Sequence, residues 1–147
     1  MEQAYKQHRD SIFRFSLYLT GDRQVSEDIV HDVFLKLANQ KEGTKEIQSV
    51  KDWLFICARN LIYNYLKKKS ITGYVPIQND SSVTIEQRIF IEQILGHLKP
   101  EERELILLRE QQRYSIGEIS KMIELSEEAV RVRLFRIRKK MQVLAKE

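Results

Sequence analysis

The sequence of 147 residues holds a single cysteine, Cys57, so no disulfide can form within the chain. Its place among apolar helix positions favours a buried structural thiol over a reactive one. No apolar run approaches the roughly 20 residues that a membrane-spanning helix needs, and the N-terminus has no apolar run behind a basic cap, as a secretion signal would. These absences exclude disulfide-framed proteins, and we expect a cytoplasmic protein with no membrane insertion.

Signals of catalysis are also missing from the sequence. The three histidines, His8, His31 and His97, are scattered and do not have the spacing of metal ligands. No glycine-rich phosphate loop is present, and no nucleophile, base and orienting group occur at a recognisable spacing. We therefore expect no enzymatic activity, no metal and no cofactor.

Apolar residues recur at helical spacing in two blocks, and no convincing alternating strand is present. Between the blocks lies "SITGYVPIQNDSSVT", whose glycine, proline and polar cluster are typical of a connection. The sequence therefore predicts an all-α protein with two small helical domains, residues 1–70 and 85–147, joined by a flexible linker over 71–84.

Helix boundaries follow from stop and cap residues. We expect a helix over about 85–98, and a following helix that runs to about Gln112. The expected boundary residues are a stop at Gly21 and starts at Ser26, Ser49, Pro100, Ser115 and Ser126.

The helix within "WLFICARNLIYNYLKKKS", residues 53–70, is predicted to have a polar and aromatic outer face. Cations suit phosphates, a ring suits stacking, and an amide suits base edges, so this mixture favours single-stranded nucleic acid. A solvated face, or a ring that covers a neighbouring helix, is the alternative. The residues that we place on the core side are Val50, Trp53, Leu54, Cys57, Leu61 and Tyr65. The outer residues are Arg59, Asn60, Tyr63 and Lys67.

Two helices joined by a tight turn over about 115–138 are typical of a helix-turn-helix. Residues 131–140 contain six basic side chains and no acidic one, which suits a helix in a major groove. A helical hairpin used only for packing is the alternative. The expected core stripe is Val130, Leu134, Ile137 and Met141. The candidate duplex-contacting residues are Glu128, Arg131, Val132, Arg133 and Arg136.

Three stretches, taken in order, resemble the bacterial RNA polymerase sigma factors of the extracytoplasmic-function (ECF) group. They are "SEDIVHDVFLKLA", "VKDWLFICARNLIYNYLKKK" and "LKPEERELILLREQQRYSIGEISKMIELSEEAVRVRLFRIRKKM". The resemblance implies a subunit that binds core RNA polymerase, through the clamp helices of the largest subunit and the flap, and binds promoter DNA, both double-stranded and melted. It also implies control by a partner, an anti-sigma factor, and we expect no additional sensor domain.

The resemblance assigns roles to particular positions. Asn60 would meet a flipped base of the minus-ten element, and the helix after Ser126 would read the minus-35 element as duplex. This sequence departs from the family pattern at Glu127, Glu128, Val132 and Phe135, so a base preference does not carry over. The positions that would dock on the clamp helices are Asp28, His31, Asp32 and Leu35.

Two rival interpretations remain at this point. The chain could be an independent dimeric helix-turn-helix regulator that binds an operator, with residues 1–70 serving as a dimerisation or effector module. It could also be an interaction scaffold whose basic faces are incidental. Tight association with core polymerase would distinguish the sigma-factor interpretation from both rivals.

Overall fold

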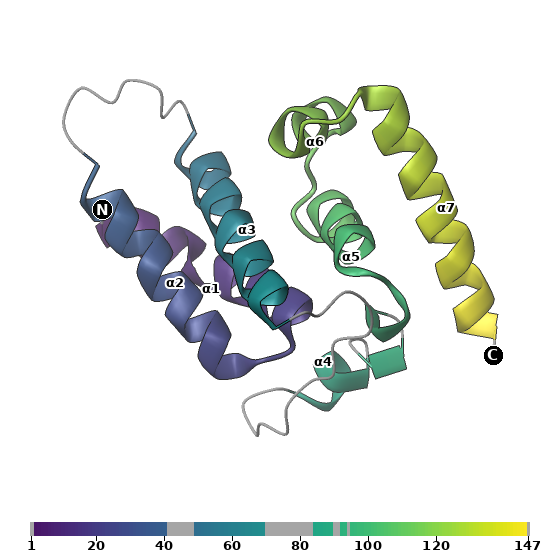
Figure 1. The fold of residues 1–147 in the computed structure, drawn as a ribbon, viewed down its shortest axis with the longest axis horizontal. Coiled ribbons are helices and arrows are strands. Elements are labelled where there is room, and N and C mark those ends of the chain that lie inside the picture. Colours follow the sequence, from purple (N-terminus) through teal and green to yellow (C-terminus); the bar gives the residue numbers. More distant parts are fainter. Residues whose placement is uncertain (1, 41–48, 70–83, 90–91, 94, 147) are drawn as a thin grey trace. The chain divides into compact units, whose positions relative to one another are not determined.

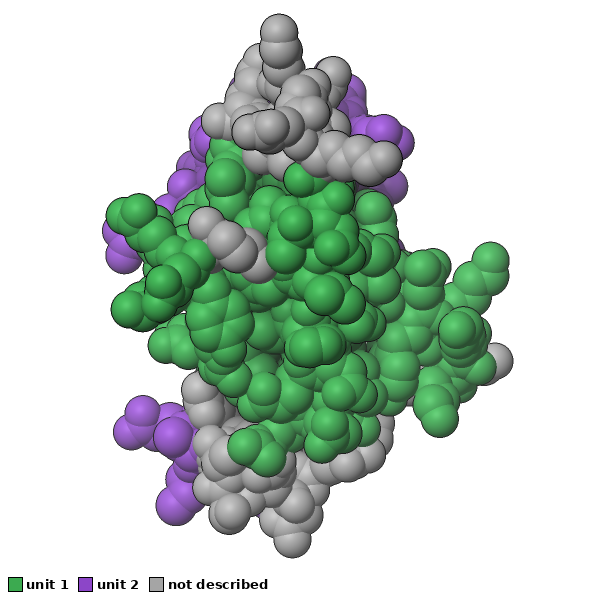
Figure 2. All heavy atoms as spheres, turned by 90° about the vertical axis from the view of Figure 1, so that its left-hand side faces the viewer, with its two compact units in different colours: residues 1–70 green, residues 71–147 purple. Residues whose placement is uncertain are grey.

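The computed structural model describes residues 2–40, 49–69, 84–89, 92–93 and 95–146. The chain forms two compact units, residues 1–70 and 71–147 (Figures 1 and 2). Every regular element in the described ranges is helical, so the all-α prediction is confirmed. Apart from Thr84, the predicted linker lies outside the described residues. None of the described helices is long and apolar enough to cross a membrane.

The described residues of unit 1 form three helices, α1 (Glu2–Thr20), α2 (Arg23–Ala38) and α3 (Val50–Lys68), each of which packs against the other two (Figure 1). The Phe15 and Phe55 rings meet edge to face with centroids 5.2 Å apart. Removing either ring would cost on the order of 3–5 kcal/mol of stability. The buried apolar side chains are Ile12, Phe15, Leu17, Tyr18, Leu19, Ile29, Val30, Val33, Phe34, Leu54, Phe55, Ala58, Ile62 and Leu66.

The start of α2 differs from the prediction. Gly21 ends α1 as expected, with a φ of 69° that glycine adopts without strain. The cap of α2 is Asp22, whose carboxylate accepts from the Val25 amide at 3.1 Å. Ser26 instead lies one turn inside the helix, fully buried, where its hydroxyl donates to the Asp22 carbonyl at 2.7 Å. The tight turn at Gly21 leaves room for the earlier cap, so α2 begins one turn sooner.

The start of α3 agrees with the prediction. The Ser49 hydroxyl accepts from the Asp52 amide at 3.2 Å, and the helix begins at the next residue, Val50. This hydrogen bond satisfies one of the backbone amides of the first turn that have no partner within the helix.

The first part of unit 2 is less regular than predicted. The described residues form α4 (Ile85–Ile89) and the short 3-10 helix η2 (Leu95–His97), so the helix predicted over about 85–98 does not continue as an α-helix through its last turn. Leu95 and Leu98 are both buried, and a three-residue repeat brings residues at this spacing onto one side. Burial of these two leucines therefore favours the tighter helix.

Pro100 begins α5 (Pro100–Ile106), as predicted, because its fixed φ and missing amide suit the first turn. The helix continues as a π-helical segment, η3 (Leu107–Gln111), and the chain then turns through Arg113. Their buried side chains include Leu105, Ile106, Leu107 and Leu108.

The helix-turn-helix consists of α6 (Ile116–Ile123) and α7 (Glu127–Lys146). The predicted capping box of Ser115 and Glu118 is present, with reciprocal hydrogen bonds of 3.1 and 2.9 Å. The Ser126 hydroxyl accepts from the Ala129 amide at 3.1 Å and so caps α7, as predicted. The buried apolar residues of α6 and α7 are Ile119, Met122, Val130, Leu134 and Ile137. Met141 is half-buried.

Candidate nucleic-acid interfaces

The outer face of α2 brings together the four residues predicted to dock on a protein partner. All four are exposed, and Leu35 is 50% accessible to solvent. Their spacing places them on one stripe of the helix. An apolar side chain about one turn beyond two carboxylates suits a protein surface, and the carboxylates repel phosphates. The residues of this docking stripe are Asp28, His31, Asp32 and Leu35.

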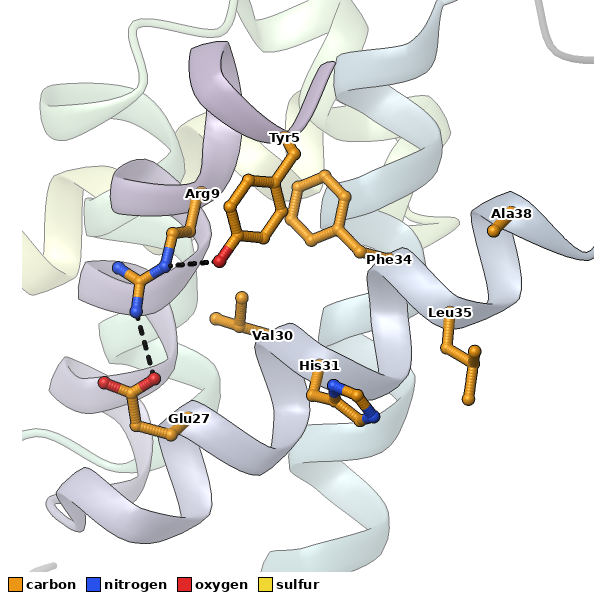
Figure 3. Close-up of a pocket in the computed structure, with 8 residues that line it drawn as sticks. All are labelled: Tyr5, Arg9, Glu27, Val30, His31, Phe34, Leu35 and Ala38. Carbon is orange, nitrogen blue, oxygen red and sulfur yellow. Dashed lines mark hydrogen bonds and ion pairs between the residues drawn. The ribbon is translucent and has the colours of Figure 1, made fainter. Parts of the chain in front are cut away.

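A hollow of about 350 Å³ between α1 and α2 borders this docking stripe (Figure 3). Arg9 donates to the Tyr5 hydroxyl at 3.0 Å and to the Glu27 carboxylate at 3.0 Å. The hydrogen bond with Tyr5, followed by the charge of Glu27, raises the pKa of the Arg9 guanidinium against the opposing effect of burial. The Tyr5 ring packs edge to face on Phe34 with centroids 5.0 Å apart. The ion pair and rings therefore hold α1 beside the stripe.

The outer face of α3 carries the residues predicted to meet single-stranded nucleic acid. Asn60 and Lys67 are exposed, whereas Arg59 and Tyr63 are half-buried. The Arg59 guanidinium lies over the Tyr63 ring, 5.0 Å from its centroid, which is within cation–π range. The structure thus brings a cation, a ring and an amide onto neighbouring turns of one helix.

The predicted orientation of α3 is wrong for Trp53. The buried stripe is Leu54, Phe55, Ala58, Ile62 and Leu66. Trp53 is half-buried and precedes Asn60 by seven residues, which is about two turns, so the two share a side of the helix. Leu54 is buried as predicted, but Val50 is exposed, and the other predicted core residues Cys57, Leu61 and Tyr65 are only half-buried. The seven-residue spacing was readable in the sequence, but the apolar character of tryptophan favoured a core position. This face of α3 therefore carries a second ring, which the prediction missed.

The outer side of α7 exposes all five predicted duplex-contacting residues: Glu128, Arg131, Val132, Arg133 and Arg136. Val132 is 40% and Phe135 is 60% accessible, although both are apolar. A shallow hollow of about 370 Å³ lies beside Glu128, Val132 and Arg136. Backbone phosphates suit the arginines, while the carboxylate and the aliphatic group suit base edges.

Several cations of α7 are held by carboxylates. The distances are 3.5 Å from Arg131 to Glu127 and 3.2 Å from Lys140 to Glu102. Exposed pairs of this kind contribute about 0–1 kcal/mol to stability, so their main effect is to restrict the orientation of the side chains. The ammonium of Lys139 lies 5.0 Å from the centroid of the Phe135 ring, which places a charge beside this exposed aromatic side chain.

The described residues contain no group of three histidine, cysteine or acidic side chains that could hold a metal ion. Burial raises the pKa of the half-buried Cys57 thiol above its ordinary value, which disfavours the nucleophilic thiolate.

Comparison with known protein families gives two matches, one on each unit. Residues 4–71 match the model described as sigma-70 region 2, and residues 91–141 match sigma-70, region 4. The two matched regions occur in the same order as the two predicted nucleic-acid surfaces.

Two curated relatives are similar over nearly the whole chain. The ECF RNA polymerase sigma factor SigM of Bacillus subtilis is 25% identical, with 98% of this chain and 94% of the relative covered. The ECF RNA polymerase sigma factor SigL of Mycobacterium tuberculosis is 27% identical, with 91% and 82% covered.

Two solved structures have a similar fold. The sigma factor RpoE of Bartonella quintana, solved with the anti-sigma factor NepR, gives a TM-score of 0.75 at 20% identity over 99% of this chain and 96% of that one. CnrH, solved with the cytosolic domain of CnrY, gives 0.77 at 19% identity over 99% and 86%.

Proposed function

The chain belongs to the sigma-70 family and, within it, to the ECF group, and from this premise we propose how its surfaces serve a promoter-specificity subunit. The protein binds core RNA polymerase and directs transcription initiation at a subset of promoters. The observation that carries this function is the ordered match to regions 2 and 4 on two compact units. An independent operator-binding regulator is not favoured, because both matches belong to a polymerase subunit. As a polymerase subunit, the protein would act in the cytoplasm.

We assign polymerase docking to the stripe on α2. The stripe combines an exposed leucine with two carboxylates on a helix that α1 holds in place through Arg9 and Glu27. These features suit the clamp helices of the largest subunit, and the resemblance adds the flap as a second contact. Complementary charge across such an interface determines which partner is accepted.

Charge reversal tests this docking assignment. The double substitution Asp28→Lys and Asp32→Lys should weaken binding to core polymerase at least tenfold, since like charges placed across an interface cost several kcal/mol. Binding of the purified variant to core polymerase can be measured by pull-down, with helicity checked by circular dichroism.

The matched control is Glu2→Lys with Asp10→Lys, which changes the net charge equally on α1. These two side chains are 87% and 81% exposed. Equal affinity of the Asp28/Asp32 variant and the control would reject the assignment to α2.

Promoter DNA is assigned to the other two surfaces. The α3 face, with Arg59, Asn60, Tyr63 and Lys67, would receive melted bases of the minus-ten element. The α7 face, with Glu128, Arg131, Val132, Arg133 and Arg136, would lie in the major groove of the minus-35 element. Stacking rings suit unpaired bases, and guanidiniums suit the phosphates of a duplex.

A further assignment concerns an inhibitory partner. Val132 and Phe135 expose apolar surface on a basic helix, which suits a site covered by another protein when DNA is absent. RpoE and CnrH, the two similar structures, were each solved with a partner, and in RpoE it is an anti-sigma factor. We therefore assign an anti-sigma factor to this face. Hydrogen exchange on α7 should be slower in cell extract than in the purified chain, and equal exchange would contradict the assignment.

A further inference from the structure

A hollow of about 500 Å³ in unit 2 is lined by four charged side chains, and none of the sites assigned above uses it. Three of the four are arginines and one is a glutamate, so the formal charge of the lining is +2. The residues come from the π-helical segment η3, from the turn that follows it and from the middle of α7. They are Arg109, Glu110, Arg113 and Arg138.

Two of the three guanidiniums are anchored by hydrogen bonds. Arg138 donates to the Glu110 carboxylate at 2.6 Å, and Arg109 donates to the backbone carbonyl of Tyr114 at 2.9 Å. Each guanidinium has five N–H donors, so one such bond leaves donors for a ligand. The anchoring fixes two cations at the rim before any anion arrives, which lowers the entropic cost of binding.

The third cation stands at an unusual backbone position. Arg113 has a φ of 60°, in the left-handed region that favours glycine, and its side chain is exposed. The Tyr114 amide donates to the Leu108 carbonyl at 3.0 Å, so the left-handed residue closes the end of η3, as Glu124 with a φ of 57° closes α6. The turn places the exposed Arg113 side chain at the hollow, while Tyr114 is buried.

The hollow lies on one flank of α7. Arg138 follows Arg131 by seven residues, about two turns, so both lie on the same side of the helix. Lys140 follows Arg133 by the same spacing and lies on the other flank. A helix in a major groove has phosphates along both flanks, and Arg138 places the hollow beside one of these flanks. The hollow therefore extends one basic flank with residues from outside α7.

We propose that this hollow binds a backbone phosphate of the minus-35 duplex, with Arg113 as the side chain that closes on it. This inference rests on the proposed function, because it needs α7 to lie in the major groove. Duplex DNA fits better than an acidic protein, since the lining is entirely charged and lacks the apolar side chains of a protein interface.

Replacing Arg113 by glycine separates function from folding. Glycine adopts the observed φ freely, so Arg113→Gly should leave the melting temperature equal or higher. Promoter binding by the holoenzyme should nevertheless weaken by about tenfold to a hundredfold, the loss typical of a charged hydrogen bond. The slope of log K against log salt should fall by about one for the lost phosphate contact.

Three further variants make the measurement specific. Arg113→Lys should retain most of the affinity for promoter DNA, because a phosphate also accepts hydrogen bonds from an ammonium. Arg113→Gln should behave like Arg113→Gly. Lys6→Gln removes the same charge from a side chain of unit 1 that is 77% exposed, and it should leave both affinity and slope unchanged.

The outcomes distinguish this inference from the function on which it rests. A normal salt slope for Arg113→Gly, beside a reduced slope for Arg136→Ala, would overturn the assignment of the hollow to a phosphate. It would leave the placement of α7 in the major groove standing. Normal slopes for both variants would overturn the placement itself. Weaker binding of Arg113→Gly to core polymerase, with an unchanged slope on DNA, would assign the hollow to an acidic protein surface and also overturn the proposal.

Discussion

The outer faces of α3 in unit 1 and of α7 in unit 2 are both basic, but they hold their cations differently. On α3, Arg59 lies over the Tyr63 ring, and an exposed amide, Asn60, stands beside it. On α7, Arg131 and Arg138 are paired with glutamates at 3.5 and 2.6 Å. Ring-supported cations suit a surface on which bases stack, whereas carboxylate-held guanidiniums suit phosphates at fixed spacing.

This difference has measurable consequences. Stacking of an unpaired base depends little on salt, but each phosphate contact releases counterions and makes binding salt-dependent. Loss of a contact on α3 should therefore be rescued when the DNA is already unpaired. Loss of a contact on α7 should instead lower the slope of log K against log salt. This loss should be the same on paired and on unpaired DNA.

The largest effect is expected from breaking one unit and leaving the other intact. Leu134 is 1% exposed in the core of unit 2, so Leu134→Ala should cost about 2–5 kcal/mol of stability there. Because unit 1 has its own buried core, polymerase docking should survive while minus-35 binding is lost. Hydrogen exchange of both units and a polymerase pull-down measure the two effects.

The volume-conserving variant Leu134→Met is the control and should cost less than about 1.5 kcal/mol. Loss of exchange protection in α1 to α3 by Leu134→Ala would show that the two units do not fold separately, and the comparison between them would then fail.

A smaller effect is expected at the ring of the α3 face. Tyr63→Ala should weaken open-complex formation by about 1–3 kcal/mol, the value for one base stacked on an aromatic side chain. A template mismatched over the minus-ten region should restore part of the loss, because the cost of unpairing has been removed. Tyr63→Phe keeps the ring and should behave almost as wild type. An equal defect on paired and mismatched templates would argue against stacking.

The smallest effects are expected from single contacts on α7. Arg133→Ala should weaken binding at many promoters alike and reduce the salt slope by about one. Glu128→Gln should instead change which promoters are preferred, by about 1 kcal/mol, because a carboxylate accepts from cytosine N4. Selection of bound fragments from a genomic library at two salt concentrations measures both. A uniform loss for both variants would remove the base-edge role from Glu128.

Much of the fold was predictable because local chemistry dictates it. Pro100, Ser115 and Ser126 begin helices in the structure as predicted, since each satisfies or avoids the orphan amides of a first turn. The prediction that Ser26 caps α2 is wrong because a second capping residue, Asp22, lies four positions earlier. The choice of Asp22 depends on the turn at Gly21, which the sequence pattern alone does not fix.

The candidate surfaces were predictable to a different degree. The exposure of the α7 residues followed from the core stripe on its opposite side. The orientation of α3 did not follow, because apolar residues occur nearly all round that helix and Trp53 was assigned to the core. The hollow beside Arg113 was not predictable at all, since it joins η3, a turn and α7, which are brought together only by tertiary packing.

The central claim is that α3 meets unpaired bases, and permanganate reactivity of thymines near the start site tests it most directly. Asn60 is exposed, so Asn60→Ala should leave folding and polymerase binding nearly intact. The variant holoenzyme should bind a library-selected promoter through α7 but leave its thymines unreactive, and a mismatched minus-ten region should restore transcription in part. Thymines as reactive with Asn60→Ala as with the wild type would contradict the claim.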